Sequence, residues 1–164
     1  MRWFWVSLIG LVLLSVEVGS LANLRPFGGG PDLVLLFVIF LSLYGPADDA
    51  PISGWLLGLA KDCLSSGTFG LHAVIFMAVA FLLSRVRADI FLEYAKAHVV
   101  NAGSATLVVY LAAGLWRWFD GAAAAGTPGF VIGVTLWNAL LAPAAFRVFF
   151  KFSRRLEAVR RRSS

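Results

Sequence analysis

Six apolar segments, separated by short polar or Gly/Pro-containing breaks, dominate the pattern of this chain. They cover Trp3–Leu21, Leu33–Tyr44, Ile52–Leu64, Phe69–Ser84, His98–Trp116 and Gly129–Phe150. The first, fifth and sixth reach the length of about 20 residues that a helix needs to cross a bilayer core. The second and third are shorter, so we expect them to extend into their flanking residues, to be shielded by neighbouring helices, or to thin the bilayer around them. The pattern predicts an all-α protein with six helices.

Composition places these helices in a membrane. The chain has 164 residues, of which 60% are hydrophobic and 14% charged, whereas soluble domains are about 45–50% apolar and about 25% charged. A single cysteine, Cys63, excludes an intrachain disulfide. Arg2 followed by an apolar run imitates a secretory signal. Glu17 inside that run and the even number of helices favour an uncleaved first span instead.

The distribution of basic residues predicts the orientation. With both termini in the cytoplasm, 11 of the 14 lysines and arginines lie on the inner side, as the positive-inside rule requires. Only Arg25, Lys61 and Arg117 remain on the outer side. We therefore expect a multi-pass protein of the inner membrane, with a six-helix domain over residues 1–152 and a basic cytoplasmic tail over residues 153–164.

The basic tail has an amphipathic pattern. Between Arg147 and Arg162 there are seven basic residues and one acid, Glu157. Helix six is expected to continue along the anionic inner leaflet, where each cation contributes about 1 kcal/mol. Nucleic acid is the alternative partner, but no recognition module accompanies the charges. The residues expected at the lipid surface are Arg147, Lys151, Arg154, Arg155, Arg160, Arg161 and Arg162.

Small and acidic residues gather in the third segment and the turn after it. Gly54, Gly58 and Asp62 recur every four residues and therefore share one helix face. Such a small-residue face lets another helix approach closely, and Gly129 with Gly133 offers a second one. The Asp62 carboxylate is expected either to accept amide hydrogen bonds within the turn, from residues 65–67, or to bind a partner. Thr68 is the expected N-cap of helix four.

Several other polar residues lie inside apolar segments. Glu17 is expected to pair with Lys61 or Arg117, which lie at a similar depth. Pro31 and Asp32 indicate a helix start with an acid in its first turn. Asn138, which precedes Pro143 in helix six, is suited to interhelical hydrogen bonding. His72 is expected to make an ordinary structural hydrogen bond.

Motifs of known catalytic sites do not occur in the sequence. It contains no phosphate-binding Walker loop, no nucleophile elbow and no metal-ligand spacing of Cys and His. Asp48 and Asp49 form the one pair of carboxylates, and they fall in a short polar turn. We therefore expect no enzyme activity, no catalytic residue, no metal and no cofactor.

Together these elements resemble the MreD family, bacterial rod shape-determining membrane proteins. The resemblance runs through residues 31–44, 54–73 and 138–152 and the basic tail. The family pattern of glycines, an aspartate and a Ser-Gly pair is met by Gly54, Gly58, Asp62, Ser66, Gly67 and Gly70. The chain departs from the family at Lys61 and Cys63, where aliphatic residues are usual, and at Gly30, where a basic residue is common.

The resemblance implies a non-enzymatic scaffold of the cell-elongation complex that builds peptidoglycan. Proteins of this family bind MreC, are linked through it to MreB, and work beside RodA and a class B penicillin-binding transpeptidase. The family fold is thought similar to the substrate-binding components of energy-coupling-factor vitamin importers. A scaffold would dock the transmembrane helix of MreC on the face of Gly54 and Gly58 or on that of Gly129 and Gly133, and a homodimer is a further expectation. The alternative is a component of a vitamin-type importer that binds a small ligand between its helices.

Overall fold

The computed structural model describes residues 2–19, 29–65, 68–87, 95–121 and 127–162, with side chains over 4–19, 29–65, 68–87, 96–121 and 127–153. The described residues form α-helices and one 3₁₀ helix, and no strand. The elements are α1 (Arg2–Gly19), α2 (Leu33–Tyr44), η2 (Ala47–Asp49), α3 (Ala50–Leu64), α4 (Leu71–Val86), α5 (Ala95–Phe119) and α6 (Pro128–Arg162). The prediction of six helices is confirmed, and α2 has the predicted bounds.

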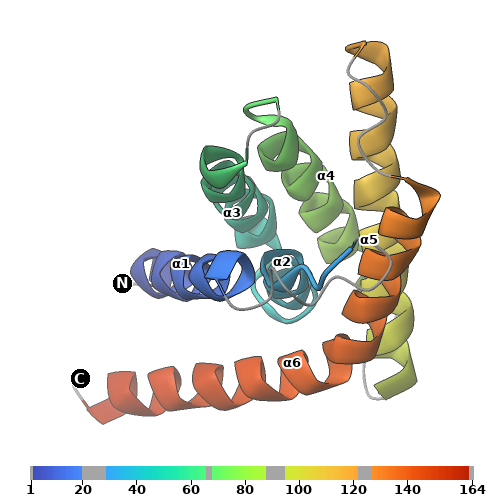
Figure 1. Cartoon of the computed structure of the whole chain (residues 1–164). Helices are drawn as coiled ribbons and strands as arrows, with labels where there is room; N and C mark the ends of the chain where they lie inside the picture. The colour runs from blue at the N-terminus through green and yellow to red at the C-terminus, as the bar shows by residue number, and fades with distance from the viewer. Residues whose placement is uncertain (1, 20–28, 66–67, 88–94, 122–126, 163–164) are drawn as a thin grey trace.

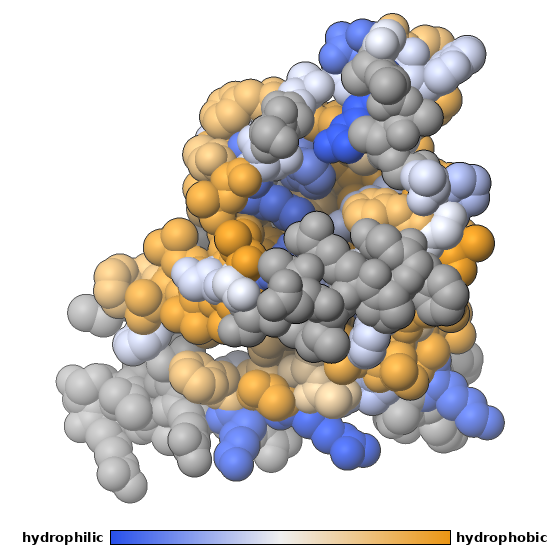
Figure 2. All heavy atoms as spheres, viewed as in Figure 1, coloured by the Kyte–Doolittle hydropathy of each residue, from blue (hydrophilic) through white to orange (hydrophobic). Residues whose placement is uncertain are grey.

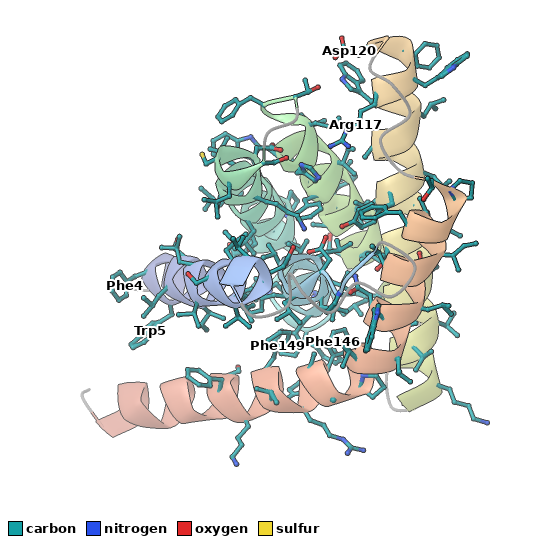
Figure 3. The ribbon with its side chains drawn as sticks, viewed as in Figure 1. Phe4, Trp5, Arg117, Asp120, Phe146 and Phe149 are labelled. Carbon is teal, nitrogen blue, oxygen red and sulfur yellow. The ribbon has the colours of Figure 1, made fainter. Side chains whose placement is uncertain are left out.

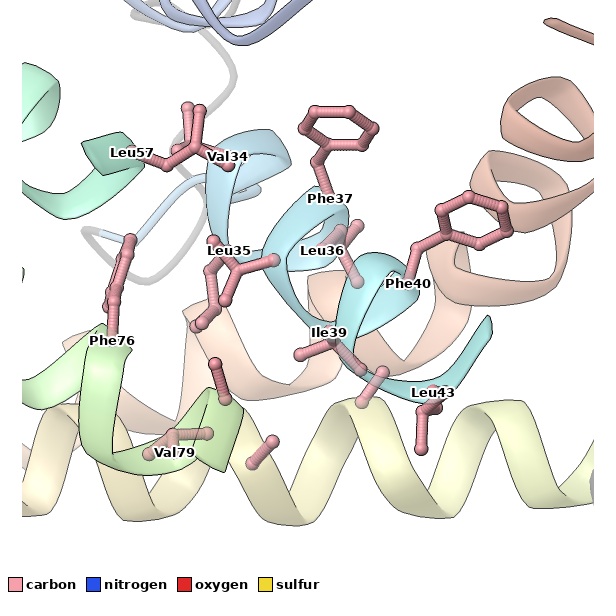
Figure 4. Close-up of a cluster of buried hydrophobic side chains, with 14 of the residues drawn as sticks. Val34, Leu35, Leu36, Phe37, Ile39, Phe40, Leu43, Leu57, Phe76 and Val79 are labelled. Carbon is pink, nitrogen blue, oxygen red and sulfur yellow. The ribbon is translucent and has the colours of Figure 1, made fainter. Parts of the chain in front are cut away.

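Helix α2 forms the centre of the bundle. It contacts α1, α3, α4, α5 and α6, and Figure 1 shows these helices around it. Nine of its 12 residues are buried. Figure 4 shows its side chains pointing outward on several sides, with Phe76 and Val79 of α4 and Leu57 of α3 close by. The shielding expected for this short apolar segment is therefore confirmed, because protein replaces lipid around it.

Helices α3 and α4 form a closely packed hairpin. A Cβ atom added at Gly54 would lie 2.6 Å from the carbonyl oxygen of Phe76, and one added at Gly58 would lie 2.5 Å from that of His72. Only glycine permits these distances between the two backbones. Helix α4 begins after Gly70, whose φ of 89° lies in the left-handed region. The expected N-cap at Thr68 is therefore wrong, because the chain turns at Gly70 instead.

Helices α5 and α6 are the longest in the structure. Over the described residues, Lys96–Phe119 and Pro128–Ser153 are long and apolar enough to cross a membrane, while α1, α2 and α4 contain shorter apolar stretches. Helix α6 first runs beside α5, then turns away and passes below α2 towards α1 (Figure 1). Pro143 lies inside α6, and a proline bends a helix because it removes one backbone hydrogen bond. The helix continues to Arg162, so its predicted extension is confirmed.

Aromatic rings of α6 pack against rings of α2. The ring centroid of Phe40 lies 5.7 Å from that of Phe146, and that of Phe37 lies 5.1 Å from that of Phe149. Tyr44 contacts Phe150 at 4.5 Å. Figure 3 shows Phe146 and Phe149 between the two helices. Tyr44 is the last residue of α2, whereas Phe37 lies about two turns before it. Because neighbouring residues of α6 contact both, this part of α6 crosses α2.

Candidate functional site

Asp32 belongs to a group of polar side chains that meet between the helices. It is the N-cap of α2, and its Oδ1 accepts a hydrogen bond of 2.9 Å from the amide of Leu35. Its own amide donates to Oδ1 of Asn138 in α6 at 2.8 Å. The helix start predicted at Pro31 and Asp32 is thus confirmed, with Asp32 one position before the first turn. An N-cap carboxylate satisfies an amide that the helix cannot.

Lys61 of α3 connects Asp32 with Glu17 of α1. Its Nζ lies 2.5 Å from Oδ2 of Asp32 and 3.1 Å from Oε1 of Glu17. The predicted pairing of Glu17 with Lys61 is confirmed. Asp32 was not predicted as the second partner, because the sequence pattern assigned it to a helix start and does not show which helix packs beside that start. Nζ also lies 5.8 Å from the centroid of the Phe76 ring, within the range of a cation–π interaction.

The same group of side chains extends into α5 and α6. The hydroxyl of Tyr110 donates to Oδ2 of Asp32 at 2.8 Å. Nδ2 of Asn138 donates to Oγ1 of Thr106 at 3.0 Å, which confirms the interhelical role predicted for the asparagine. We call this group the polar network; its members are Glu17, Asp32, Lys61, Thr106, Tyr110 and Asn138. It joins α1, α2, α3, α5 and α6.

Two carboxylates share one ammonium group in the polar network. The side chain of Asp32 is 2% exposed, that of Lys61 13% and that of Glu17 20%. Ionised groups at such depth require paired partners, because hydrocarbon does not solvate them. Removing one member would leave the others charged and buried. The network therefore holds five helices in one arrangement.

A second polar contact joins α3 to α4. Oδ1 of Asp62 accepts a 2.7 Å hydrogen bond from Nδ1 of His72 and a 3.2 Å bond from its amide, and Oδ2 accepts one of 3.0 Å from the amide of Ala73. Because a carboxylate only accepts, Nδ1 is the donor. The structural hydrogen bond predicted for His72 is confirmed. The expected bonds from residues 65–67 are wrong at Ser65, whose amide donates to the Asp62 carbonyl; Ser66 and Gly67 lie outside the described residues.

One of the two predicted glycine faces is covered by another helix of the same chain. Gly54 and Gly58 are covered by the backbone of α4, so the expectation that this face receives a partner helix is wrong. In α6, Gly133 is buried and Gly129 is partly buried. Nearby, a Cβ atom at Gly29 would lie 2.5 Å from the carbonyl oxygen of Phe130. The close approaches at Gly29, Gly54 and Gly58 are intramolecular.

The predicted lipid-surface residues all lie on α6. Arg147 and Lys151 are exposed. Arg154, Arg155, Arg160, Arg161 and Arg162 belong to its helical backbone, and their side chains lie outside the described part. Figure 2 shows hydrophilic atoms gathered along the free edge of this helix and a second patch between α4 and α5.

Sequence reasoning missed Tyr110 and Thr106. Both lie in α5, an apolar helix, and their four-residue spacing puts them on one face. Thr106 is completely buried. A pair of hydroxyl groups on one face of an apolar helix is the signal that could have indicated a contact with Asp32 and Asn138.

The polar network links helices through bonds among its own side chains. The carboxylates and the ammonium of the polar network bond one another, and no group of three His, Cys, Asp or Glu residues in the described part could hold a metal ion. A cavity of about 50 Å³ lies at the opposite end of α2, lined by Val6, Leu41, Gly45, Pro46, Asp49, Ala50 and Ser53. Its volume is sufficient for a few water molecules.

A comparison with known protein families identifies the family of this chain. Residues 2–156 match the family model described as rod shape-determining protein MreD. No curated protein and no solved structure matches the chain. The expected similarity to energy-coupling-factor components therefore remains a prediction.

Proposed function

Because the chain belongs to the MreD family of rod shape-determining membrane proteins, we propose that it is a non-enzymatic scaffold of the cell-elongation complex. In this proposal it binds MreC in the inner membrane and, through MreC, connects to MreB, RodA and a class B penicillin-binding transpeptidase. Its role is to hold the wall-synthesis proteins together while peptidoglycan is made.

The observation that carries this proposal is the polar network. Glu17, Asp32 and Lys61 pair with one another between the helices. The ion pairs and hydrogen bonds of the network hold five helices in fixed positions relative to one another. A scaffold requires such rigid helices, because they carry its binding faces. A scaffold with preformed faces orders fewer groups when its partner binds, so binding is stronger.

The topology that goes with this function is six membrane spans with both termini in the cytoplasm. The basic end of α6 would then lie on the same side as Arg85 and Lys96, as the positive-inside rule favours. The polar network would lie in the outer half of the membrane, because Lys61 and Arg117 are predicted to lie at the outer ends of their helices. Cysteine accessibility at the two ends of α5 would test this orientation.

We expect partner binding to use faces that the bundle leaves open, because α4 covers the face of Gly54 and Gly58. Large apolar side chains are exposed on α1, α4, α5 and α6, for example Leu8 at 40%, Val74 at 58%, Leu107 at 41% and Leu136 at 59%. These faces contact lipid wherever no partner covers them. One of them is expected to receive the transmembrane helix of MreC.

Cross-linking from single cysteines tests the proposal. Cys63 is exposed and would first be replaced by serine. Cysteines at Leu8, Val74, Leu107 and Leu136 are then expected to cross-link to MreC from one face and not from the others. A cysteine at Val38, which is 0% exposed, is the negative control. Absence of a cross-link from all four faces would contradict direct binding.

A small-ligand-binding importer component is the second candidate. Six polar side chains from five helices meet between the helices, as they do in ligand sites of membrane proteins. Against this, their hydrogen-bonding groups are occupied by one another. A saturable rise in melting temperature with one vitamin, absent with the others, would favour the importer.

A further inference from the structure

The C-terminal half of α6 has three different sides. The first faces protein, because the rings of Phe146 and Phe149 pack on Phe37 and Phe40 of α2. Both phenylalanines are buried, at 1% and 8% exposure. These ring contacts fix the rotation of the helix about its own axis, so the directions of the remaining side chains are also fixed.

A second side is basic and faces away from the bundle. Arg147 and Lys151 are exposed, and within the described residues neither makes an ion pair or hydrogen bond. Helical periodicity places positions 154, 155, 161 and 162, all arginines, on the same face as these two. Position 160 falls on a different face, although it is also an arginine.

The third side is apolar and lies next to the basic one. Val148 is 60% exposed and Phe152 49% exposed. An exposed valine and phenylalanine beside a row of cations match the boundary between acyl chains and phosphate groups. A nucleic acid would satisfy the cations but would leave these apolar side chains in water.

We propose that this part of α6 binds the headgroups of anionic phospholipids. Its basic row consists of Arg147, Lys151, Arg154, Arg155, Arg161 and Arg162. Val148 and Phe152 contact the acyl chains beneath the headgroups, and Phe146 with Phe149 holds the helix at that depth. The proposal is independent of MreC binding, because it concerns only lipid and the chain itself.

The test compares two variants that lose the same charge. The first, Arg147→Gln with Lys151→Gln, removes two cations of the basic row. The second, Lys96→Gln with Arg117→Gln, removes one cation near each end of α5 and none from α6. Each variant and the natural chain would be titrated in detergent with phosphatidylglycerol or phosphatidylcholine, and the bound lipids counted by native mass spectrometry.

The natural chain is expected to prefer phosphatidylglycerol, and the preference should fall as salt rises because screening weakens exposed charges. The row variant should bind it about fivefold more weakly for each cation removed. The control variant should keep most of the preference. Equal binding of the two lipids by the natural chain, or equal loss in the two variants, would overturn the proposal. Displacement of the lipid by an equimolar oligonucleotide would overturn it in favour of nucleic acid.

Discussion

The two ends of α2 are held by different interactions. At the N-terminal end, the Asp32 carboxylate is bonded to Lys61 and Tyr110 and its amide to Asn138. At the C-terminal end, Phe40 and Tyr44 pack on rings of α6, and the Tyr44 hydroxyl forms a 2.6 Å hydrogen bond with Nε2 of His98. One end is fixed by directional polar bonds and the other mainly by ring packing.

This difference predicts different tolerance to substitution. Hydrogen bonds and ion pairs in a low-dielectric interior have strict geometry, and an unpaired member is costly. Ring packing is made of many weak contacts that neighbouring side chains can partly replace. The polar end should therefore be sensitive to substitutions that keep side-chain volume, whereas the aromatic end should accept them.

The largest effect is expected for Lys61→Met. The methionine fills similar volume but leaves Asp32 and Glu17 without their cation, which should lower the free energy of unfolding by about 3–5 kcal/mol. Unfolding in mixed micelles, followed by tryptophan fluorescence, would measure it. Lys96→Met, at an exposed lysine, is the control and should change stability by less than about 0.5 kcal/mol. A similar small change for Lys61→Met would remove the distinction between the two ends.

Gly58→Ala tests the polar end without changing a charge. Gly58 and Lys61 belong to the same helix, α3, so a shift of α3 also moves Lys61 relative to Asp32. The added Cβ would lie 2.6 Å from Cα of Ala73, and separating α3 from α4 should cost about 1–3 kcal/mol. Gly114→Ala is the matched control, since nothing lies within 4 Å of its Cβ position. It should be neutral or slightly stabilising. Equal stability of the two variants would refute the close approach of α3 and α4.

Asn138→Leu tests the uncharged part of the polar end. The leucine keeps the volume but leaves the amide of Asp32 unpaired and removes the bond to Thr106. Interhelical hydrogen bonds in membranes contribute about 0.6–1.7 kcal/mol, so a loss near 1.5 kcal/mol is expected in the same unfolding assay. A gain in stability would mean that Asn138 serves something other than the fold.

Phe146→Leu should have the smallest effect. It removes ring contacts with Phe40, Tyr44 and His98 but keeps an apolar side chain of similar reach. Loss of aromatic pairing alone is about 0.5–1.5 kcal/mol, and neighbouring side chains should recover part of it. A loss larger than that of Lys61→Met, measured under the same conditions, would reverse the proposed ranking of the two ends.

The sequence predicted the elements better than their contacts. Helix positions follow from apolar runs and breakers, so all six helices lie where the pattern indicated. The pairing of Glu17 with Lys61 was predictable because buried charges seek opposite charges at similar depth. The contact of Lys61 with Asp32, and of Asp62 with the start of α4, depends on how helices pack, which periodicity does not encode.

The glycines show the same limit. Gly54 and Gly58 correctly indicated a close helix–helix contact, since only small residues permit one. The spacing could not tell whether the approaching helix belongs to the same chain or to a partner, and the structure assigns it to α4.

Depletion of this protein in its own cells tests the scaffold proposal most directly, with rescue by the natural chain as the control. Cell shape and the amount of MreC that co-purifies with the wall-synthesis proteins would be measured together. We expect depleted cells to become round and the co-purified MreC to fall, and both to recover on rescue. Depleted cells that stay rod-shaped and keep MreC in the complex would contradict the account.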